Sequence, residues 1–146
     1  MPVINPYLTF SGNCEDAFNF YKTVFGGDFS YMGRFSDMPS DGSKAMSEEE
    51  GRKIMHISLP LSKETVLMGS DTGGEWADSV IVGNNITISI NADSKEQADE
   101  LYNKLSDGGK ASMPMNQTFW GDYFGMCTDR FDINWMVSFN ENTKAD

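Results

Sequence analysis

The sequence contains two segments with the same organisation, and this internal repeat constrains the fold more than any other feature. The segments cover residues 4–35 and 84–115, and each predicts a strand, a helix, a glycine pair and a second strand in that order. The glycine pairs, Gly26-Gly27 and Gly108-Gly109, follow the two expected helices at corresponding points, as left-handed helix ends require. The repeat therefore indicates a duplicated structural unit.

Both helices show start signals and an apolar stripe. Asn13 is the expected N-cap of the first helix, and Ser94 with Gln97 forms a capping box for the second. Each stripe recurs at i, i+3 and i+7, the spacing that places side chains on one helix face. The stripe residues are Phe18, Tyr21 and Phe25, then Ala98, Leu101 and Leu105.

Two further strands follow each unit, so the pattern β-α-β-β-β is written twice. This predicts an α+β fold in one domain, 1–146, with a first module at about 1–71, a linker at 72–83 and a second module at 84–146. The linker contains Trp76, and the polar loop 36–52 is expected to be mobile and exposed.

Composition excludes several classes of protein. The net charge of -11 would repel nucleic acid and anionic membranes, and no apolar run is long enough to span a bilayer. The N-terminus lacks a signal-peptide pattern, and two cysteines favour a reduced protein over a disulfide framework. We therefore expect a cytoplasmic protein without nucleic-acid or membrane partners.

Six stretches resemble the PhnB-like branch of the vicinal-oxygen-chelate superfamily, which includes glyoxalase I, extradiol dioxygenases and fosfomycin- and bleomycin-resistance proteins. The resemblance implies two βαβββ modules whose mixed sheets curve into a cup with the helices outside, and a homodimer. One departure is visible, because relatives often carry Asp-Pro-x-Gly where this chain has Asp129-Arg130-Phe131-Asp132. The six stretches are GNCEDAFNFYKTVFGG, KIMHISLPL, LMGSD, GNNITISI, MPMNQTFWGDYFGMCTDRF and INWM.

Alternation along the strands separates a core face from a ligand face, because successive side chains point to opposite sides of a sheet. The sets expected beneath the helices are Leu8 and Phe10; Met55, Ile57 and Leu59; Ile86, Ile88 and Ile90; and Ile133, Trp135, Val137 and Phe139. The opposite sets are uncharged and rich in hydroxyls, as in a ligand cup. They are Tyr7 and Thr9; His56 and Ser58; Asn85, Thr87 and Ser89; and Asn134, Met136 and Ser138.

The superfamily's metal enzymes use His, Gln or Glu on the first and fourth strands of each module. Carried over by the resemblance, these positions fall on Tyr7, Met68, Asn85 and Met136. These side chains are poor ligands for zinc or iron, so we expect no metal site and no cofactor. The demethylubiquinone methyltransferase description sometimes given to this branch is also unsupported, since no glycine-rich loop suited to S-adenosylmethionine follows a strand.

The candidate ligand-binding residues converge on one cavity in this interpretation: Tyr7, His56, Met68, Asn85, Tyr123 and Met136. His56, the only histidine, either lines the cup or is a satisfied strand histidine. Cys14 lies in a first helical turn that could lower its pKa, although packing is the expected function of both cysteines. Trp135 is assigned to the core and Tyr123 to the cup.

Three functions remain open. The first is a metal-free protein that binds an unidentified small molecule. The second is a metal-dependent lyase or dioxygenase-type enzyme of the superfamily, with metal ligands at other positions. The third is a dimeric interaction module whose cup is vestigial.

Overall fold

The computed structural model describes residues 2–37, 46–73 and 78–141. The chain forms two compact units, Met1–Ile81 and Val82–Asp146. Trp76 and the middle of the expected loop 36–52 lie outside the described residues.

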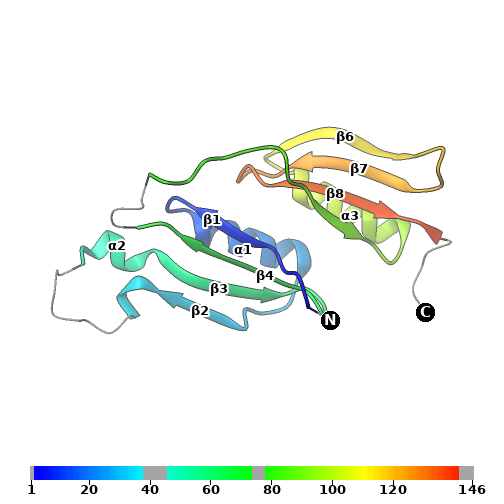
Figure 1. The fold of residues 1–146 in the computed structure, drawn as a ribbon. Coiled ribbons are helices and arrows are strands. Elements are labelled where there is room, and N and C mark those ends of the chain that lie inside the picture. Colours follow the sequence, from blue (N-terminus) through cyan, green and yellow to red (C-terminus); the bar gives the residue numbers. More distant parts are fainter. Residues whose placement is uncertain (1, 38–45, 74–77, 142–146) are drawn as a thin grey trace. The chain divides into compact units, whose positions relative to one another are not determined.

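The first unit is a four-stranded sheet with a helix on one face (Figure 1). The strand order is β1-β4-β3-β2, in which β1 runs parallel to β4 and the other neighbours are antiparallel. The elements are β1 (Tyr7–Phe10), α1 (Cys14–Phe25), β2 (Tyr31–Arg34), the 3-10 turn η1 (Phe35–Asp37), α2 (Glu48–Arg52), β3 (Ile54–Pro60) and β4 (Val66–Asp71).

The second unit repeats this topology. Its order is β5-β8-β7-β6, again with one parallel pair, β5 and β8, and two antiparallel pairs. The elements are β5 (Ile88–Asn91), α3 (Lys95–Ser106), β6 (Lys110–Gln117), β7 (Tyr123–Thr128) and β8 (Asn134–Phe139). The predicted βαβββ repeat and the α+β class are confirmed.

The helix signals behave differently in the two units. Ser94 accepts from the Gln97 amide at 3.0 Å, so the predicted Ser94 cap is formed, while Gln97 Oε1 accepts from the amide of Asp93 instead of that of Ser94. Asn13 makes no side-chain cap. The carboxylate of Asp71, at the end of β4, instead accepts from the amides of Gly12 and Cys14 at 2.9 Å each.

The core lies between each helix and its sheet, as the alternation predicts. Phe18 packs so closely on β4 that a Cβ added at Gly69 would lie 2.7 Å from its ring. In the second unit, Trp135 and Val137 are fully buried on the α3 side. Other buried members of the predicted sets and stripes are Leu8, Phe10, Tyr21, Ile57, Leu59, Ala98 and Leu105.

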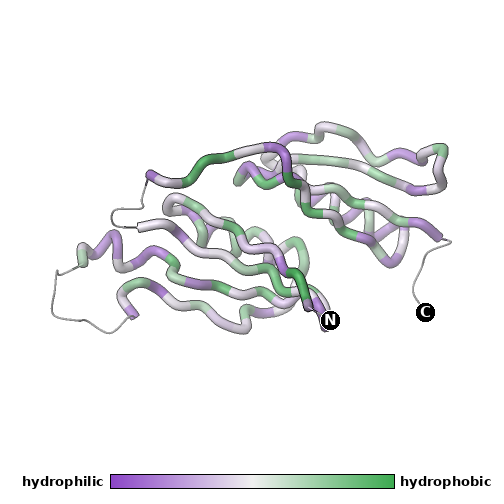
Figure 2. The backbone as a smooth tube through the Cα atoms, in the orientation of Figure 1, coloured by the Kyte–Doolittle hydropathy of each residue, from purple (hydrophilic) through white to green (hydrophobic). Residues whose placement is uncertain are grey.

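The predicted strand beginning at Asn84 is shorter than expected. β5 begins only at Ile88, whose partner in the parallel strand β8 is Trp135. Asn85 therefore precedes the strand, and Ile86 is 78% exposed instead of packing beneath a helix. Both residues lie in the segment before β5, which also contains the exposed apolar residues Ile81 and Val82. Figure 2 shows the hydropathy along this part of the backbone.

Two other boundaries differ from the prediction. The loop expected at 36–52 contains η1 and α2 in its described parts, and Ser47 caps α2 by accepting from the Glu50 amide. The strand expected from Thr118 begins at Tyr123, because Gly121, with φ 103°, turns the chain. Trp120 is consequently exposed in this turn, and its ring lies edge-on to that of Phe124, at 6.3 Å between centroids.

No helix among the described residues is long and apolar enough to cross a membrane.

Candidate functional site

A cluster built around His56 lies on the face of the first sheet opposite α1; we call it the histidine face. It consists of Tyr7, Tyr31, His56, Ser58 and Met68. Strand register brings them together: Tyr7 pairs with Met68 across β1 and β4, Met68 with Ser58, and Ser58 with Tyr31. Paired residues send their side chains to the same face, so four strands contribute to one surface.

Both ring nitrogens of His56 are engaged. Nδ1 lies 3.2 Å from the Tyr7 hydroxyl, and Nε2 lies 3.0 Å from Ser58 Oγ. Because a hydroxyl can donate or accept, both hydrogen bonds of His56 can form with either neutral tautomer of the imidazole and also with the imidazolium. The arrangement fixes the imidazole plane, and the Tyr7 and Tyr31 rings lie 5.6 and 5.7 Å from it, centroid to centroid.

The histidine face is accessible. Tyr7 is 47% exposed and Tyr31 49% exposed, whereas Ser58 beneath them is buried. The five residues carry no lysine, arginine or carboxylate. The face can therefore offer aromatic rings, a thioether and a hydrogen-bonding imidazole to a molecule, but no fixed charge of either sign.

The predicted site residue Met136 lies in the second unit, but its neighbour is not the residue that the sequence predicts. Met136 lies on the sheet face opposite α3, and its partner across β5 and β8 is Ser89 rather than Asn85. Asn85 is exposed and precedes the strand. The position corresponding to the Tyr7–Met68 pair is therefore occupied by Ser89 and Met136.

The prediction that Tyr123 shares a face with Met136 is wrong. Tyr123 pairs with Phe139 across β7 and β8, on the side that carries Trp135 and Val137 and is covered by α3. Its hydroxyl donates to Asp99 of α3, and this bond raises the pKa of Tyr123. Lys95 lies over the ring at 4.7 Å from its centroid. Tyr123 thus attaches the helix to the sheet.

The cysteine prediction is also corrected. Burial, strengthened by the nearby carboxylates of Asp71 and Glu15, raises the pKa of Cys14 instead of lowering it. Burial and Asp129 raise the pKa of Cys127 to about 11. Neither thiol has the environment of a nucleophile, which leaves the predicted packing function for both.

The superfamily's metal site does not fit the residues present. Tyr7 and Met68 are neighbours in the first sheet, and Ser89 and Met136 in the second, so the four positions offer two thioethers and two hydroxyls. Zinc and iron prefer imidazole, carboxylate and thiolate ligands. Within the described ranges, no group of three or more His, Cys, Asp or Glu side chains is placed to hold a metal ion.

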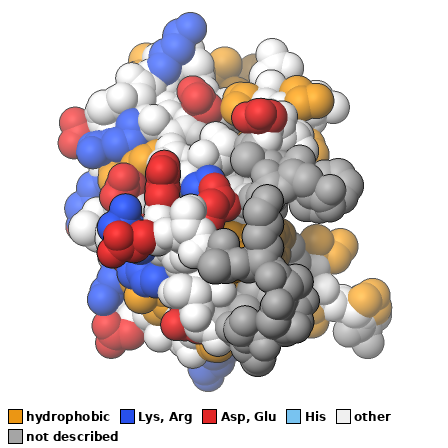
Figure 3. Space-filling view, turned by 90° about the vertical axis from the view of Figure 1, so that its left-hand side faces the viewer, with side chains coloured by type: hydrophobic (Ala, Val, Ile, Leu, Met, Phe, Trp, Pro, Cys, Tyr) orange, Lys and Arg blue, Asp and Glu red, His pale blue; other side chains and the backbone are white. Residues whose placement is uncertain are grey.

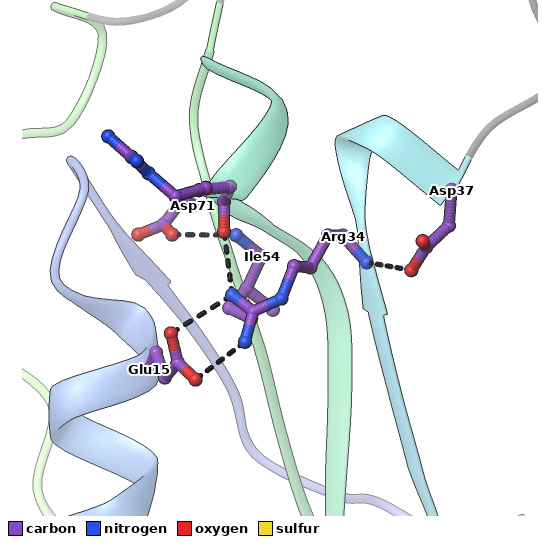
Figure 4. A network of polar contacts seen from close by, with 6 residues as sticks. Glu15, Arg34, Asp37, Ile54 and Asp71 are labelled. Carbon is purple, nitrogen blue, oxygen red and sulfur yellow. Dashed lines mark hydrogen bonds and ion pairs between the residues drawn. The ribbon is translucent and has the colours of Figure 1, made fainter. Parts of the chain in front are cut away.

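The N-terminus of α1 is not available to bind a cofactor phosphate. The Gly12 and Cys14 amides already donate to the Asp71 carboxylate, whose other oxygen accepts from the Ile54 amide at 2.9 Å (Figure 4). Beside it, Arg34 binds both oxygens of Glu15 on α1, at 2.9 and 2.7 Å (Figure 4). The hydrogen bonds from Arg34 lower the pKa of Glu15. This network joins α1 to β2, β3 and β4.

Figure 3 shows the distribution of charged side chains on one side of the molecule. Acidic and basic side chains are interspersed there and do not separate into a patch of one sign. The net charge of -11 is consistent with a general solubility effect.

Comparison with known proteins now identifies the family. The family described as 3-demethylubiquinone-9 3-methyltransferase matches residues 2–138. The chain belongs to this family. Among solved structures, protein PA1353 from Pseudomonas aeruginosa is 37% identical, with a TM-score of 0.80 over 96% of this chain and 98% of that one.

Two further solved structures share the fold. The PhnB protein from Bacillus cereus is 22% identical, with a TM-score of 0.70 over 93% of this chain and 98% of its own. A glyoxalase/bleomycin resistance protein from Albidiferax ferrireducens T118 is 13% identical and shares the fold, with a TM-score of 0.61 over 93% and 96% of the chains. The expected fold is therefore confirmed as one that this chain shares with a PhnB protein and a glyoxalase/bleomycin resistance protein.

Sequence reasoning missed Tyr31 as a member of the histidine face. Its strand is short, carries a glycine and has a register shift between Gly33 and Arg34, so alternation alone gave no clear inner and outer set. In the structure, Tyr31 pairs with Ser58, which lies two residues from His56, and this pairing places Tyr31 on the same face as His56.

Proposed function

We propose that this protein binds a small organic molecule on the histidine face and does so without the superfamily's divalent metal. The supporting observation is the hydrogen-bond chain from Tyr7 through His56 to Ser58, beside the half-exposed rings of Tyr7 and Tyr31. It combines aromatic surface with one oriented polar group, as ligand sites commonly do. The ligand is uncharged or cationic, because an anion would find no lysine or arginine there to offset its desolvation.

A thermal-shift screen of planar and aliphatic compounds tests this proposal, because a ligand raises the melting temperature with the logarithm of its excess over the dissociation constant. Any hit is then titrated by calorimetry against His56→Ala, Tyr7→Phe and Tyr31→Leu. We expect at least a tenfold loss of affinity in the first and third variants, and a smaller loss in Tyr7→Phe, which keeps the ring.

Phe119→Leu is the matched control, because Phe119 is a fully accessible aromatic residue outside the histidine face. It should bind like the parent protein. Hits whose affinity is unchanged by all three histidine-face variants would place binding elsewhere. A screen without hits would favour the interaction-module alternative.

The metal-dependent alternative is tested separately. Protein purified without chelators should contain no stoichiometric zinc, iron, manganese or nickel. One such ion per chain, with an activity lost on chelation, would overturn the metal-free proposal.

We also propose that the protein is a cytoplasmic homodimer. We infer the dimer because proteins of the resembled superfamily are usually homodimers. We infer the cytoplasm because both cysteines are buried and form no disulfide, as is usual in a reducing compartment. Analytical ultracentrifugation at micromolar concentration should give about twice the 16.3 kDa chain mass. A single species at the chain mass would refute the dimer.

A further inference from the structure

Three methionines form a straight row across the second sheet. Met113 of β6 is the direct partner of Met126 in β7, and Met126 is the direct partner of Met136 in β8. Directly paired residues project to the same face. That face is the one opposite α3, since the alternate residues Cys127 and Trp135 are buried on the helix side. We call this set the methionine row.

The spacing lets the three sulfur atoms meet. Neighbouring strands lie about 4.8 Å apart, and a methionine side chain is unbranched and has three rotatable bonds. Met113 and Met136 can therefore lean over the central Met126 from either side. Met113 is 48% exposed and the other two are partly exposed, so the sulfurs are within reach of solvent.

The backbone beneath the row is held in place from the other side of the sheet. The Tyr102 hydroxyl of α3 lies 3.0 Å from the Met113 carbonyl oxygen and 3.1 Å from that of Met126, sharing its proton between them. The β6–β7 ladder shifts register on both sides of Met113, and such bulges redirect side chains. Tyr102 thus fixes the pairing of Met113 with Met126 between two irregularities.

We propose that the methionine row binds one soft monovalent metal ion, Cu(I), through three thioether sulfurs. Thioethers select Cu(I) over the harder divalent ions, and the net charge of -11 favours a cation. The methionine row includes one of the four carried-over superfamily positions, Met136, and it has no residue in common with the histidine face.

Silver(I) is the probe, because it shares the preference of Cu(I) for sulfur and does not change oxidation state. Ag(I) nitrate is titrated in chloride-free buffer into the full chain labelled with carbon-13 at the methionine methyl groups. Of the ten methionine signals, we expect the three from the row to move together and to saturate at one Ag(I) per chain. Cu(I) titrated under anaerobic conditions should then displace Ag(I) from the same signals.

Substitution separates the row from other sulfur atoms. Met126→Leu conserves volume and should lower the affinity for Ag(I) at least tenfold, as should Met113→Leu. Met32→Leu, an exposed methionine of the first unit, should leave the titration unchanged. Tyr102→Phe should weaken binding while leaving all three sulfurs in place, and circular dichroism checks the fold of each variant.

The proposal falls if Ag(I) leaves the three row signals in place, or if the two that remain in Met126→Leu respond at the same Ag(I) concentration as in the parent protein. Movement of these signals with an apolar compound but not with Ag(I) would also overturn it, showing that the row is an apolar contact surface. Ligand binding at the histidine face is unaffected by any of these results, so the two proposals fail independently.

Discussion

The buried carboxylate of Asp129 accepts a hydrogen bond from the indole Nε1 of Trp135 at 2.8 Å. Its other oxygen accepts from the amides of Phe131 and Ile133, at 2.7 and 3.1 Å. One side chain therefore closes the turn between β7 and β8 and anchors the largest core residue of the second unit. In the first unit, the carboxylate of Asp71 also accepts three hydrogen bonds, from the amides of Gly12, Cys14 and Ile54, and it joins the start of α1 to β3.

Replacing Asp129 by alanine should destabilise the protein by about 3 kcal/mol, because it leaves three N–H donors without this acceptor, one of them on a buried indole. Urea unfolding followed by tryptophan fluorescence measures the change. Asp28→Ala removes an almost fully exposed carboxylate and should stay within about 0.5 kcal/mol of the parent. A loss for Asp129→Ala no larger than this control would contradict the assigned anchor.

Asp132→Gly should stabilise the protein. Asp132 is the only described non-glycine residue with positive φ, at 69°, and it stands where the family's Asp-Pro-x-Gly pattern has glycine. Glycine adopts this region without the Cβ clash, so we expect a gain of about 0.5–1 kcal/mol. Asp132→Ala, which keeps the clash, is the comparison. Thermal unfolding showing no advantage of glycine over alanine would indicate that the turn relaxes.

Strand β7 shows where sequence reasoning ended. The period-two pattern correctly placed Leu8, Ile57, Trp135 and Val137 on the helix side, since each strand's apolar set is fixed by its own residues. The register between β7 and β8 decides instead which alternate residues of β7 lie on the same face as Trp135. The structure pairs Cys127 with Trp135, which carries Tyr123 to the helix side. The residues of β7 do not decide between the two parities, because both contain apolar or aromatic side chains, and the assignment of Tyr123 to the cup was therefore wrong.

Local capping illustrates a second limit. The Ser94 cap was predictable because all of its partners lie within four residues. The first helix is capped by Asp71, 57 residues from Cys14 in sequence, so only the folded sheet reveals it. In the histidine face, alternation assigned Tyr7 and His56 to the same cavity, and they meet because β4 pairs with both β1 and β3. Tyr31 joins them only through the pairing of β2 with β3.

Neither cysteine should react with a thiol reagent in the folded protein. At pH 8 an unperturbed cysteine, with a pKa of about 8.5, is about one-quarter thiolate. Burial raises the pKa of Cys127 to about 11 and that of Cys14 further, so the reactive form is scarce as well as shielded. Labelling with dithionitrobenzoate should be slow in buffer and fast in denaturant. A rapid native reaction of either thiol would contradict the burial that we describe.

Glu15→Gln should weaken the protein at neutral pH but not in acid. Hydrogen bonds from Arg34 lower the folded-state pKa of Glu15 below the unfolded value of about 4.3. Its stabilisation is therefore present above that value and is lost as the pH falls through the folded-state pKa.

Because the pair is partly exposed to solvent, we expect a loss of only about 1 kcal/mol at pH 7, decreasing at high salt. Urea unfolding at pH 7 and pH 3 measures the difference, and Glu64→Gln, in the β3–β4 turn, serves as the control. Equal losses for Glu15→Gln at both pH values would show that the contact with Arg34 stabilises through packing, without dependence on the carboxylate charge.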